Sequence, residues 1–534
     1  MEGGGIQALE MVFLLLLLFV VAFGALARKL GTPYPIVLVL AGLLLSFVPG
    51  IPRITLNPDV IFFVVLPPLL YSAAWLTSWR EFSYNLVSIL FLAFGLVFFT
   101  VLGVAWLAPW FFSGLDWRMG FVLGAVVAPT DAIAATSIAK QIRLPKRIVD
   151  ILEGESLVND ASGLLALEFG IAMLVRGETA TISDGLLRLM YLIAAGLAVG
   201  LLIGAIVNWV EERIDHGPIE IALSIMVPYV AYLAADSMRA SGVLAVVACG
   251  LYLSRKSSNF FSASVRLQAW AVWESLTFIL NGLVFVLIGL QLPYVLRGLR
   301  DYSLRGLLLD GALFSLLLIA LRVFWVFPGA YMSNVIRRRV FHQAEPLPPA
   351  RQVFIVGWTG MRGVICLAAA IALPETLASG APFTQRNLII FLTFSVILVT
   401  LVVQGLALPP LVRALGLAGG GGRNTEEEEA RRLILEAALG HLQQVRSEND
   451  DSLAEIYDDL QHHYQHRMAS LKQDANDIHT DHHQHFVELS RALLRTERQT
   501  AVRLRDEGRI NDELLRDLER QLDLSEARFL TSNA

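Results

Sequence analysis

A stretch of the chain that is apolar enough to cross a membrane carries several polar side chains at its centre. Residues 149–172 are mostly hydrophobic, but positions 154–160 read Gly-Glu-Ser-Leu-Val-Asn-Asp. A charged side chain at the centre of a bilayer costs at least about 2.5–3.5 kcal/mol, so such residues usually serve a function. This segment is therefore the first candidate for chemistry.

The spacing of these polar residues places them together. Glu155 and Asn159 are four positions apart, as are Ser156 and Asp160. Each pair lies along one side of a helix, and the two sides are adjacent. We expect the oxygen atoms to point into protein or a water-filled cavity. The alternative is a polar patch that only joins helices, but such patches usually use Ser, Thr or Asn, without two acids.

Two further spans contain signals for a helix break. Pro129, followed by Thr130 and Asp131, lacks a backbone donor and disfavours helical angles at the residue before it. A break here would free carbonyl groups to face a cation and would place Asp131 at the start of a half-helix, where negative charge is favoured. A simple proline kink is the alternative. The second span contains Gly-Trp-Thr-Gly-Met-Arg-Gly at positions 357–363.

These two spans, residues 118–140 and 352–374, are seven helices apart in our count and so cross in opposite directions. Two interrupted helices of opposite orientation are typical of an inverted-repeat transporter with a site near mid-membrane.

The charges near this site predict its chemistry. We expect Arg362 to neutralise Glu155 and the half-helix end to stabilise Asp131. Asp160 is then left without a fixed counter-ion, and only a proton or a small cation can satisfy it in a low dielectric. Competition of two ions for one carboxylate, with alternating access, describes an exchanger. Asn159 is neutral, which favours an electroneutral one-for-one exchange.

The composition predicts the elements that hold this site. Hydrophobic residues make up 55% of the chain and charged residues 17%, with a mean hydropathy of +0.59. From Arg413 onward there are 16 basic and 24 acidic residues, a net charge near −8, against 26 and 23 before it. We infer a membrane domain and an acidic cytosolic tail. The acidic tail argues against nucleic-acid binding, and we expect no cofactor and no metal beyond a transported cation.

A membrane span needs about 20 apolar residues. We predict an all-α, multi-pass membrane protein with about thirteen spans, at residues 9–27, 33–49, 59–76, 84–109, 118–140, 148–174, 184–209, 218–236, 242–254, 268–290, 304–335, 352–374 and 387–412. Basic residues in short loops number 15 on one side and 9 on the other. The positive-inside rule then places the N-terminus outside and the tail in the cytoplasm of a cell (inner or plasma) membrane.

Three segments are predicted: a membrane domain over residues 1–417, a glycine-rich linker over 418–425 and a helical regulatory tail over 426–534. Six of the tail histidines are candidate pH sensors, namely His462, His463, His466, His482, His483 and His485. His462 and His466 also have metal-ligand spacing. Exposed histidines on solvated helices are the alternative, and the ligand of the tail stays open.

Five motifs, in order along the chain, resemble those of the sodium/proton antiporters in the monovalent cation/proton exchanger family. They are residues 66–71 (Leu-Pro-Pro-Leu-Leu-Tyr), 129–131, 154–160, 281–292 and 360–363 (Gly-Met-Arg-Gly). The resemblance covers residues 9–413, and the tail is similar to that of bacterial antiporters with a cytosolic extension.

The resemblance implies a homodimer in which a core bundle, helices 4–6 and 11–13, moves like an elevator against a dimerisation bundle, helices 1–3 and 7–10. It implies that Asp160 binds the transported ion, with Thr130, Ser156 and Glu155 nearby, and that Arg362 pairs with Glu155. It also implies that Asn159 marks the electroneutral branch of the family.

One residue departs from the family pattern, because Ser72 stands where many relatives have Glu. This leaves the ion preference open between Na⁺, which we favour, and K⁺ or a broad range of Na⁺, K⁺, Li⁺ and Rb⁺. A membrane sensor with a signalling tail and no transport is a further alternative. Arg322 and Glu274 are expected to form structural ion pairs outside the ion site.

Overall fold

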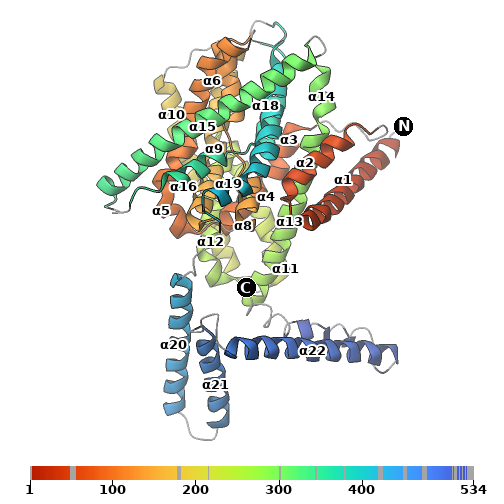
Figure 1. Cartoon of the computed structure of the whole chain (residues 1–534), viewed down its shortest axis with the longest axis vertical. Coiled ribbons are helices and arrows are strands. Elements are labelled where there is room, and N and C mark those ends of the chain that lie inside the picture. The colour runs from red at the N-terminus through yellow and green to blue at the C-terminus, as the bar shows by residue number, and fades with distance from the viewer. Residues whose placement is uncertain are drawn as a thin grey trace. The chain divides into compact units, whose positions relative to one another are not determined.

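The computed structural model describes residues 3–48, 56–112, 114–142, 144–176, 182–214, 216–299, 302–342, 346–377, 380–418, 425–448, 454–471 and 478–507, with a few single residues up to 525. Within these residues every regular element is a helix, apart from an isolated bridge between Thr376 and Pro382 (Figure 1).

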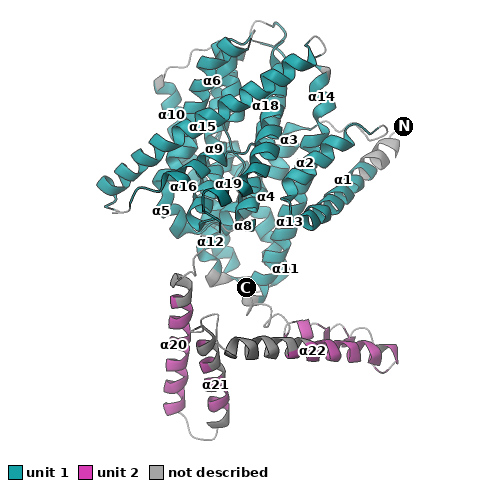
Figure 2. Cartoon of the chain, viewed as in Figure 1, with its two compact units in different colours: residues 1–421 teal, residues 422–534 magenta. Residues whose placement is uncertain are grey.

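The chain divides into two compact units, residues 1–421 and residues 422–534 (Figure 2). The first contains the apolar helices and is the membrane unit. The second contains α20 (Thr425–Glu448), α21 (Ala454–Leu471) and α22 (Ile478–Asp506), of which α20 and α21 pack against each other.

The first half of the membrane unit runs through α1 (Gly3–Leu30), α2 (Tyr34–Leu45), α3 (Pro58–Val60), η1 (Ile61–Val65), α4 (Leu66–Leu76), α5 (Trp79–Leu90), η2 (Phe91–Leu96), α6 (Val97–Phe111), α7 (Trp117–Val127), α8 (Ala132–Gln141), α9 (Lys146–Ile171) and η3 (Ala172–Arg176). The η segments are π-helical turns that continue into the neighbouring α-helices.

The second half contains α10 (Ile182–Glu211), α11 (Gly217–Ser237), α12 (Gly242–Phe260), α13 (Ala263–Leu290), α14 (Leu292–Arg297), α15 (Leu304–Val340), α16 (Ala350–Trp358), α17 (Val364–Ile371), α18 (Arg386–Leu398), η4 (Val399–Gln404) and α19 (Gly405–Ala414).

Nine helices of the described residues are long and apolar enough to cross a membrane. They coincide with nine of the thirteen predicted spans. The other four predictions, residues 33–49, 118–140, 242–254 and 352–374, fall on α2, on α7 with α8, on α12, and on α16 with α17. These helices are not among the nine, so the count of thirteen stays a prediction.

Glycines allow several helices to pack backbone against backbone. A Cβ atom built on Gly42 of α2 would lie 2.3 Å from the carbonyl oxygen of Val286, and one on Gly289 of α13 would lie 2.3 Å from that of Val39. On α10, a Cβ at Gly200 would lie 2.2 Å from the carbonyl oxygen of Ala245. Small residues favour close helix contacts in membranes, where the surrounding lipid is as apolar as the side chains.

Helix α9 carries the polar residues at positions 155–160 and lies at the centre of the first unit. It contacts α5, η2, α7 and α8, and it also contacts α12 and α16. Helix α15 packs against α16, while α17 packs against α7 and α18. The two short helix pairs, α7–α8 and α16–α17, are thereby brought next to the polar face of α9.

Candidate functional site

The segment between α7 and α8 is non-helical and capped by an aspartate. Helix α7 ends at Val127 and α8 begins at Ala132, and Pro129 lies in the gap. The Asp131 carboxylate accepts a hydrogen bond from the backbone N–H of Ile133, at 2.8 Å. Asp131 thus lies directly before α8 and satisfies a backbone donor that the helix itself cannot satisfy.

The segment between α16 and α17 lies directly beside the first gap. Helix α16 ends at Trp358 and α17 begins at Val364. The N–H of Asp131 donates to the carbonyl oxygen of Met361 at 2.8 Å, which joins the two non-helical segments. A Cβ built on Gly363 would lie 2.4 Å from an Asp131 carboxylate oxygen, so this position requires glycine for the contact.

Arg362 binds backbone carbonyls at this junction. Its Nε atom donates to the carbonyl oxygen of Val127, at 3.1 Å, and its Nη1 atom donates to that of Gly360. The side chain is 2% exposed. Its positive charge therefore lies at the carboxyl end of α7, where the helix dipole favours a cation.

The predicted ion pair between Arg362 and Glu155 is wrong, because Glu155 pairs with Arg322 of α15. Nη1 and Nη2 of Arg322 lie 2.5 and 2.8 Å from the two carboxylate oxygens, in a bidentate pair. Both residues are 1% exposed. Arg322 also donates to the carbonyl oxygen of Val356, at 3.1 Å from Nη2. Buried charges need a partner with good geometry. The packing of α15 against α16, which itself contacts α9, supplies it.

Gly360 makes this arrangement possible. A Cβ atom at this position would lie 2.2 Å from Cδ of Arg322 and 2.4 Å from its Nε. Gly360, the first glycine of the Gly-Met-Arg-Gly motif, therefore leaves room for Arg322 and not for Arg362 of the same motif.

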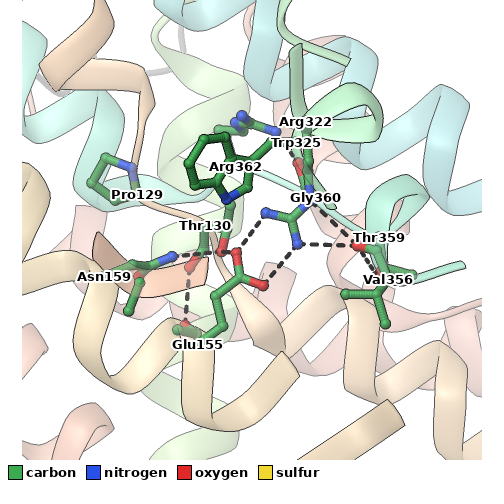
Figure 3. Close-up of polar contacts among 12 residues, drawn as sticks. Pro129, Thr130, Glu155, Asn159, Arg322, Trp325, Val356, Thr359, Gly360 and Arg362 are labelled. Atoms are coloured by element: carbon green, nitrogen blue, oxygen red, sulfur yellow. Dashed lines mark hydrogen bonds and ion pairs between the residues drawn. The ribbon is translucent and has the colours of Figure 1, made fainter. Parts of the chain in front are cut away.

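Thr130 connects the first gap to the polar face of α9 (Figure 3). Its hydroxyl donates to Oε1 of Glu155 at 3.1 Å and accepts a hydrogen bond from the Asn159 amide at 2.7 Å (Figure 3). The hydroxyl of Ser156 donates to the Thr130 carbonyl oxygen at 2.9 Å. Four of the predicted site residues thus form one hydrogen-bonded network, which is anchored by Arg322.

Asp160 stands apart from this network. Its side chain is 3% exposed, and among the described residues none donates a hydrogen bond to its carboxylate or forms an ion pair with it. It lines a cavity of about 750 Å³, together with Asp131, Thr130 and Ser156. Glu155 and Asn159 are not part of the lining.

The cavity carries an excess of negative charge. Its described lining residues include four acids, Asp131, Asp150, Glu153 and Asp160, against a single basic residue, Lys146. Lys146 begins α9, and its side chain is 70% exposed. Fourteen residues of helix separate Lys146 from Asp160, about 21 Å at 1.5 Å per residue. An acidic cleft of this depth raises the local concentration of cations at its inner end.

Ser72, which departs from the family pattern, also lines this cavity. Its hydroxyl donates to the carbonyl oxygen of Leu69 at 3.1 Å and accepts from the Thr277 hydroxyl at 3.3 Å. The cavity wall is therefore neutral at this point.

The remaining predicted residues are less well defined by the structure. His462 is exposed on α21, and the side chains of His463, His466, His482, His483 and His485 lie outside those that the structure describes. Glu274 on α13 is exposed. The sequence predicts that Arg322 forms a structural ion pair outside the ion site, but its partner is Glu155, one of the predicted site residues. An arginine in the middle of the apolar span 304–335 indicates a buried acidic partner, but its position in the sequence does not identify which acid.

Comparison with known proteins agrees with this geometry. Residues 14–414 match the family described as "Sodium/hydrogen exchanger, transmembrane". An uncharacterized Na⁺/H⁺ exchanger of Mycobacterium tuberculosis is 34% identical over 93% of this chain and 92% of its own length. A sodium, potassium, lithium and rubidium/H⁺ antiporter of Bacillus subtilis is 32% identical over 82% of this chain and 66% of its own length.

The fold is similar to that of a solved structure, the sodium proton antiporter of Methanocaldococcus jannaschii at pH 8. The TM-score is 0.60 at 20% identity, over 77% of this chain and 99% of that one. The chain belongs to the sodium/hydrogen exchanger family. It is a multi-pass membrane protein and a cation/proton antiporter, which is a secondary transporter rather than an enzyme.

Proposed function

We propose that this protein exchanges Na⁺ for H⁺, one for one and without net charge movement, and that the two ions compete for Asp160. The observation that carries the proposal is the position of this carboxylate at the inner end of an acidic cavity, with no cation paired to it among the described residues. An ionised carboxylate in such surroundings is costly until a proton or a cation binds to it.

The other site residues support Asp160 in different ways. Thr130 and Ser156 line the same cavity and offer oxygen atoms to a bound cation. Glu155 and Asn159, which do not line the cavity, form hydrogen bonds with the Thr130 hydroxyl. Because the charge of Glu155 is balanced by Arg322 and Asn159 is neutral, we assign the change of charge during ion exchange to Asp160, which lies outside this network.

Transport requires the site to face each side of the membrane in turn. We propose that a core bundle, built around α9 and the interrupted pairs α7–α8 and α16–α17, moves against a dimerisation bundle in a homodimer. The cavity leads from Asp160 to the exposed Lys146, which begins α9 after a basic loop. The basic loop residues favour a cytoplasmic position for this loop and the tail. We therefore propose that the cavity opens toward the cytoplasm.

A broad cation range is a second candidate for the substrate. The Bacillus subtilis relative is named for sodium, potassium, lithium and rubidium, and Ser72 leaves the cavity wall neutral where selectivity could be set. A sensor without transport is the third reading.

One experiment separates these readings. Purified protein is placed in liposomes with an imposed pH gradient, and Na⁺, Li⁺, K⁺ and Rb⁺ are added in turn, with and without a clamped voltage. Collapse of the gradient that voltage does not alter supports electroneutral exchange and identifies the substrates. Collapse by K⁺ and Rb⁺ as well as Na⁺ supports the broad range. If no cation collapses the gradient in folded protein, the antiport proposal is wrong.

A further inference from the structure

A second pocket, on another side of α9, has basic residues in its lining, whereas the charged residues of the cavity that Asp160 lines (the ion cavity) are mainly acidic. It lies between α5–η2, α9, α15 and α16 and has a volume of about 70 Å³. On this measure about 10–15 Å³ accommodates one water molecule. The pocket therefore has room for a group the size of a phosphate.

The polar part of this pocket is basic. Its described lining residues include two arginines, Arg147 and Arg337, and none is acidic. Asn334 and Gln352 add neutral hydrogen-bonding groups. The ion cavity, by contrast, has four acids and one lysine in its described lining. A pocket with this composition favours an anion, and arginine suits phosphate because it presents several fixed N–H donors.

These polar residues come from helix ends that meet at one place. Arg147 lies in the first turn of α9, Arg337 in the last turn of α15 and Gln352 near the start of α16. Arg337 is 4% exposed, and its guanidinium carbon lies 4.6 Å from the centroid of the Tyr84 ring. Ends of long apolar helices lie at the membrane interface, where lipid headgroups lie.

The rest of the lining is apolar. Phe91, Ile151, Val326 and Val353 contribute to it. Val326 and Gly329 precede Arg337 on the same face of α15, so an apolar wall leads along this helix to the arginine. A binding site with a basic end and apolar walls suits an amphiphile with an anionic head.

We propose that this pocket binds the phosphate headgroup of an anionic membrane lipid, with Arg147 and Arg337 holding the phosphate and the apolar walls holding the adjoining part of the acyl chain. Basic pockets between membrane helices on the cytoplasmic side commonly bind such headgroups. The inference goes beyond ion exchange, and its test does not require transport activity.

The position of the pocket couples it to the ion site. Val356 lines the pocket, and its carbonyl oxygen accepts the hydrogen bonds of Arg322, which holds Glu155. A lipid in the pocket therefore stabilises α16 against α15 at the point that positions the buried ion pair.

The test measures the thermal unfolding of the full chain in a neutral detergent. Phosphatidylglycerol, phosphatidylcholine and inorganic phosphate are titrated separately, and an apparent Kd is taken from each shift. We expect phosphatidylglycerol to stabilise the protein most. Arg147→Gln together with Arg337→Gln should raise its apparent Kd about thirtyfold, because each arginine near an anionic headgroup contributes about 1 kcal/mol.

The matched control is Arg338→Gln with Arg339→Gln, which removes the same charge from the same end of α15, outside the pocket lining. This control should keep the affinity of the wild type. Equal losses in the control and in the pocket variant would overturn the proposal. Stabilisation of the wild type by inorganic phosphate alone, to the same extent as by the lipid, would overturn the assignment to a lipid.

A second variant keeps both arginines and blocks the apolar wall. A Cβ on Gly329 would meet only Trp325, at 3.4 Å, so Gly329→Leu extends into the pocket without displacing backbone. We expect this variant to unfold at the wild-type temperature without lipid and to lose the stabilisation by phosphatidylglycerol. Full retention of that stabilisation would contradict the proposal, even if the arginine variant does not fold.

Discussion

Two buried carboxylates of α9, five residues apart, have opposite surroundings. Glu155 is bound by both terminal nitrogens of the Arg322 guanidinium and by the Thr130 hydroxyl, so its negative charge is balanced. Asp160 faces the cavity, and no described residue forms an ion pair with it. A balanced carboxylate positions its neighbours, whereas an unbalanced one needs an exchangeable ion. The roles that we propose for the two residues rest on this difference in their partners.

Asp160→Asn should abolish exchange and leave the protein folded, because a neutral amide cannot alternate between a proton and a cation. Exchange is measured in liposomes and folding by thermal unfolding. Glu168→Gln is the matched control, since Glu168 lies on the same helix but on the exposed side, beside Arg188. Wild-type turnover in the Asp160 variant would exclude this residue as the ion site.

Competition at Asp160 also predicts a dependence on pH. As the pH falls and the proton occupies the carboxylate, the apparent KM for Na⁺ should rise, by about tenfold per pH unit once the site is mostly protonated, with little change in maximal rate. Initial rates at a series of Na⁺ concentrations and pH values test this. A maximal rate that falls while KM stays constant would contradict competition.

Arg322→Gln should destabilise the protein by about 3–5 kcal/mol, because it leaves the Glu155 charge buried without its partner. The double variant Arg322→Gln with Glu155→Gln should regain much of this stability, since it removes both charges. Thermal unfolding measures both effects. If Arg362→Gln together with Glu155→Gln, rather than the Arg322 combination, restored stability, the pairing described here would be incorrect.

At the scale of elements, the site depends on two helix interruptions that support each other. Asp131 caps α8, its N–H binds Met361, and Arg362 binds the last carbonyl of α7. Each gap thus satisfies backbone groups of the other, which neither could do alone inside a membrane. Gly360 and Gly363 permit the approach of Arg322 and Asp131.

Gly360→Ala should destabilise the membrane unit by at least about 1–3 kcal/mol, the usual cost of overpacking. The added methyl would lie 2.2 Å from Cδ of Arg322, which the Glu155 ion pair prevents from moving away. Gly185→Ala on α10 is the control, because its Cβ would find no atom closer than 3.8 Å. Equal unfolding temperatures for the two variants would count against the tight packing at Gly360.

At the scale of the whole molecule, the chain consists of an apolar unit and a polar one. The described contacts of the candidate ion site all lie within residues 1–421, and residues 422–534 form a unit of their own. The tail is acidic and rich in histidine, a residue whose charge changes near neutral pH. We propose that the tail has a regulatory role and that this role is separable from transport.

Removal of the tail from Gly420 onward should leave a folded unit that still exchanges ions. If the histidines sense pH, the pH profile of exchange should shift, and replacement of the six histidines by Gln in the full chain should cause the same shift. Liposome exchange between about pH 6 and pH 8 measures this. Identical profiles for all three proteins would assign the histidines to the solvated surface.

The sequence alone predicted the candidate site residues, because polar groups, proline and glycine within apolar spans can be recognised from their cost and spacing. It predicted a helix break near Pro129, with Asp131 at the start of the helix that follows, and a second break within residues 357–363; the structure has non-helical segments at residues 128–131 and 359–363. Only the tertiary structure decided which arginine meets Glu155. Spacing orders groups along one helix, but a partner on another helix is selected by packing, and that choice balances the charge of Glu155 and leaves Asp160 open to the cavity.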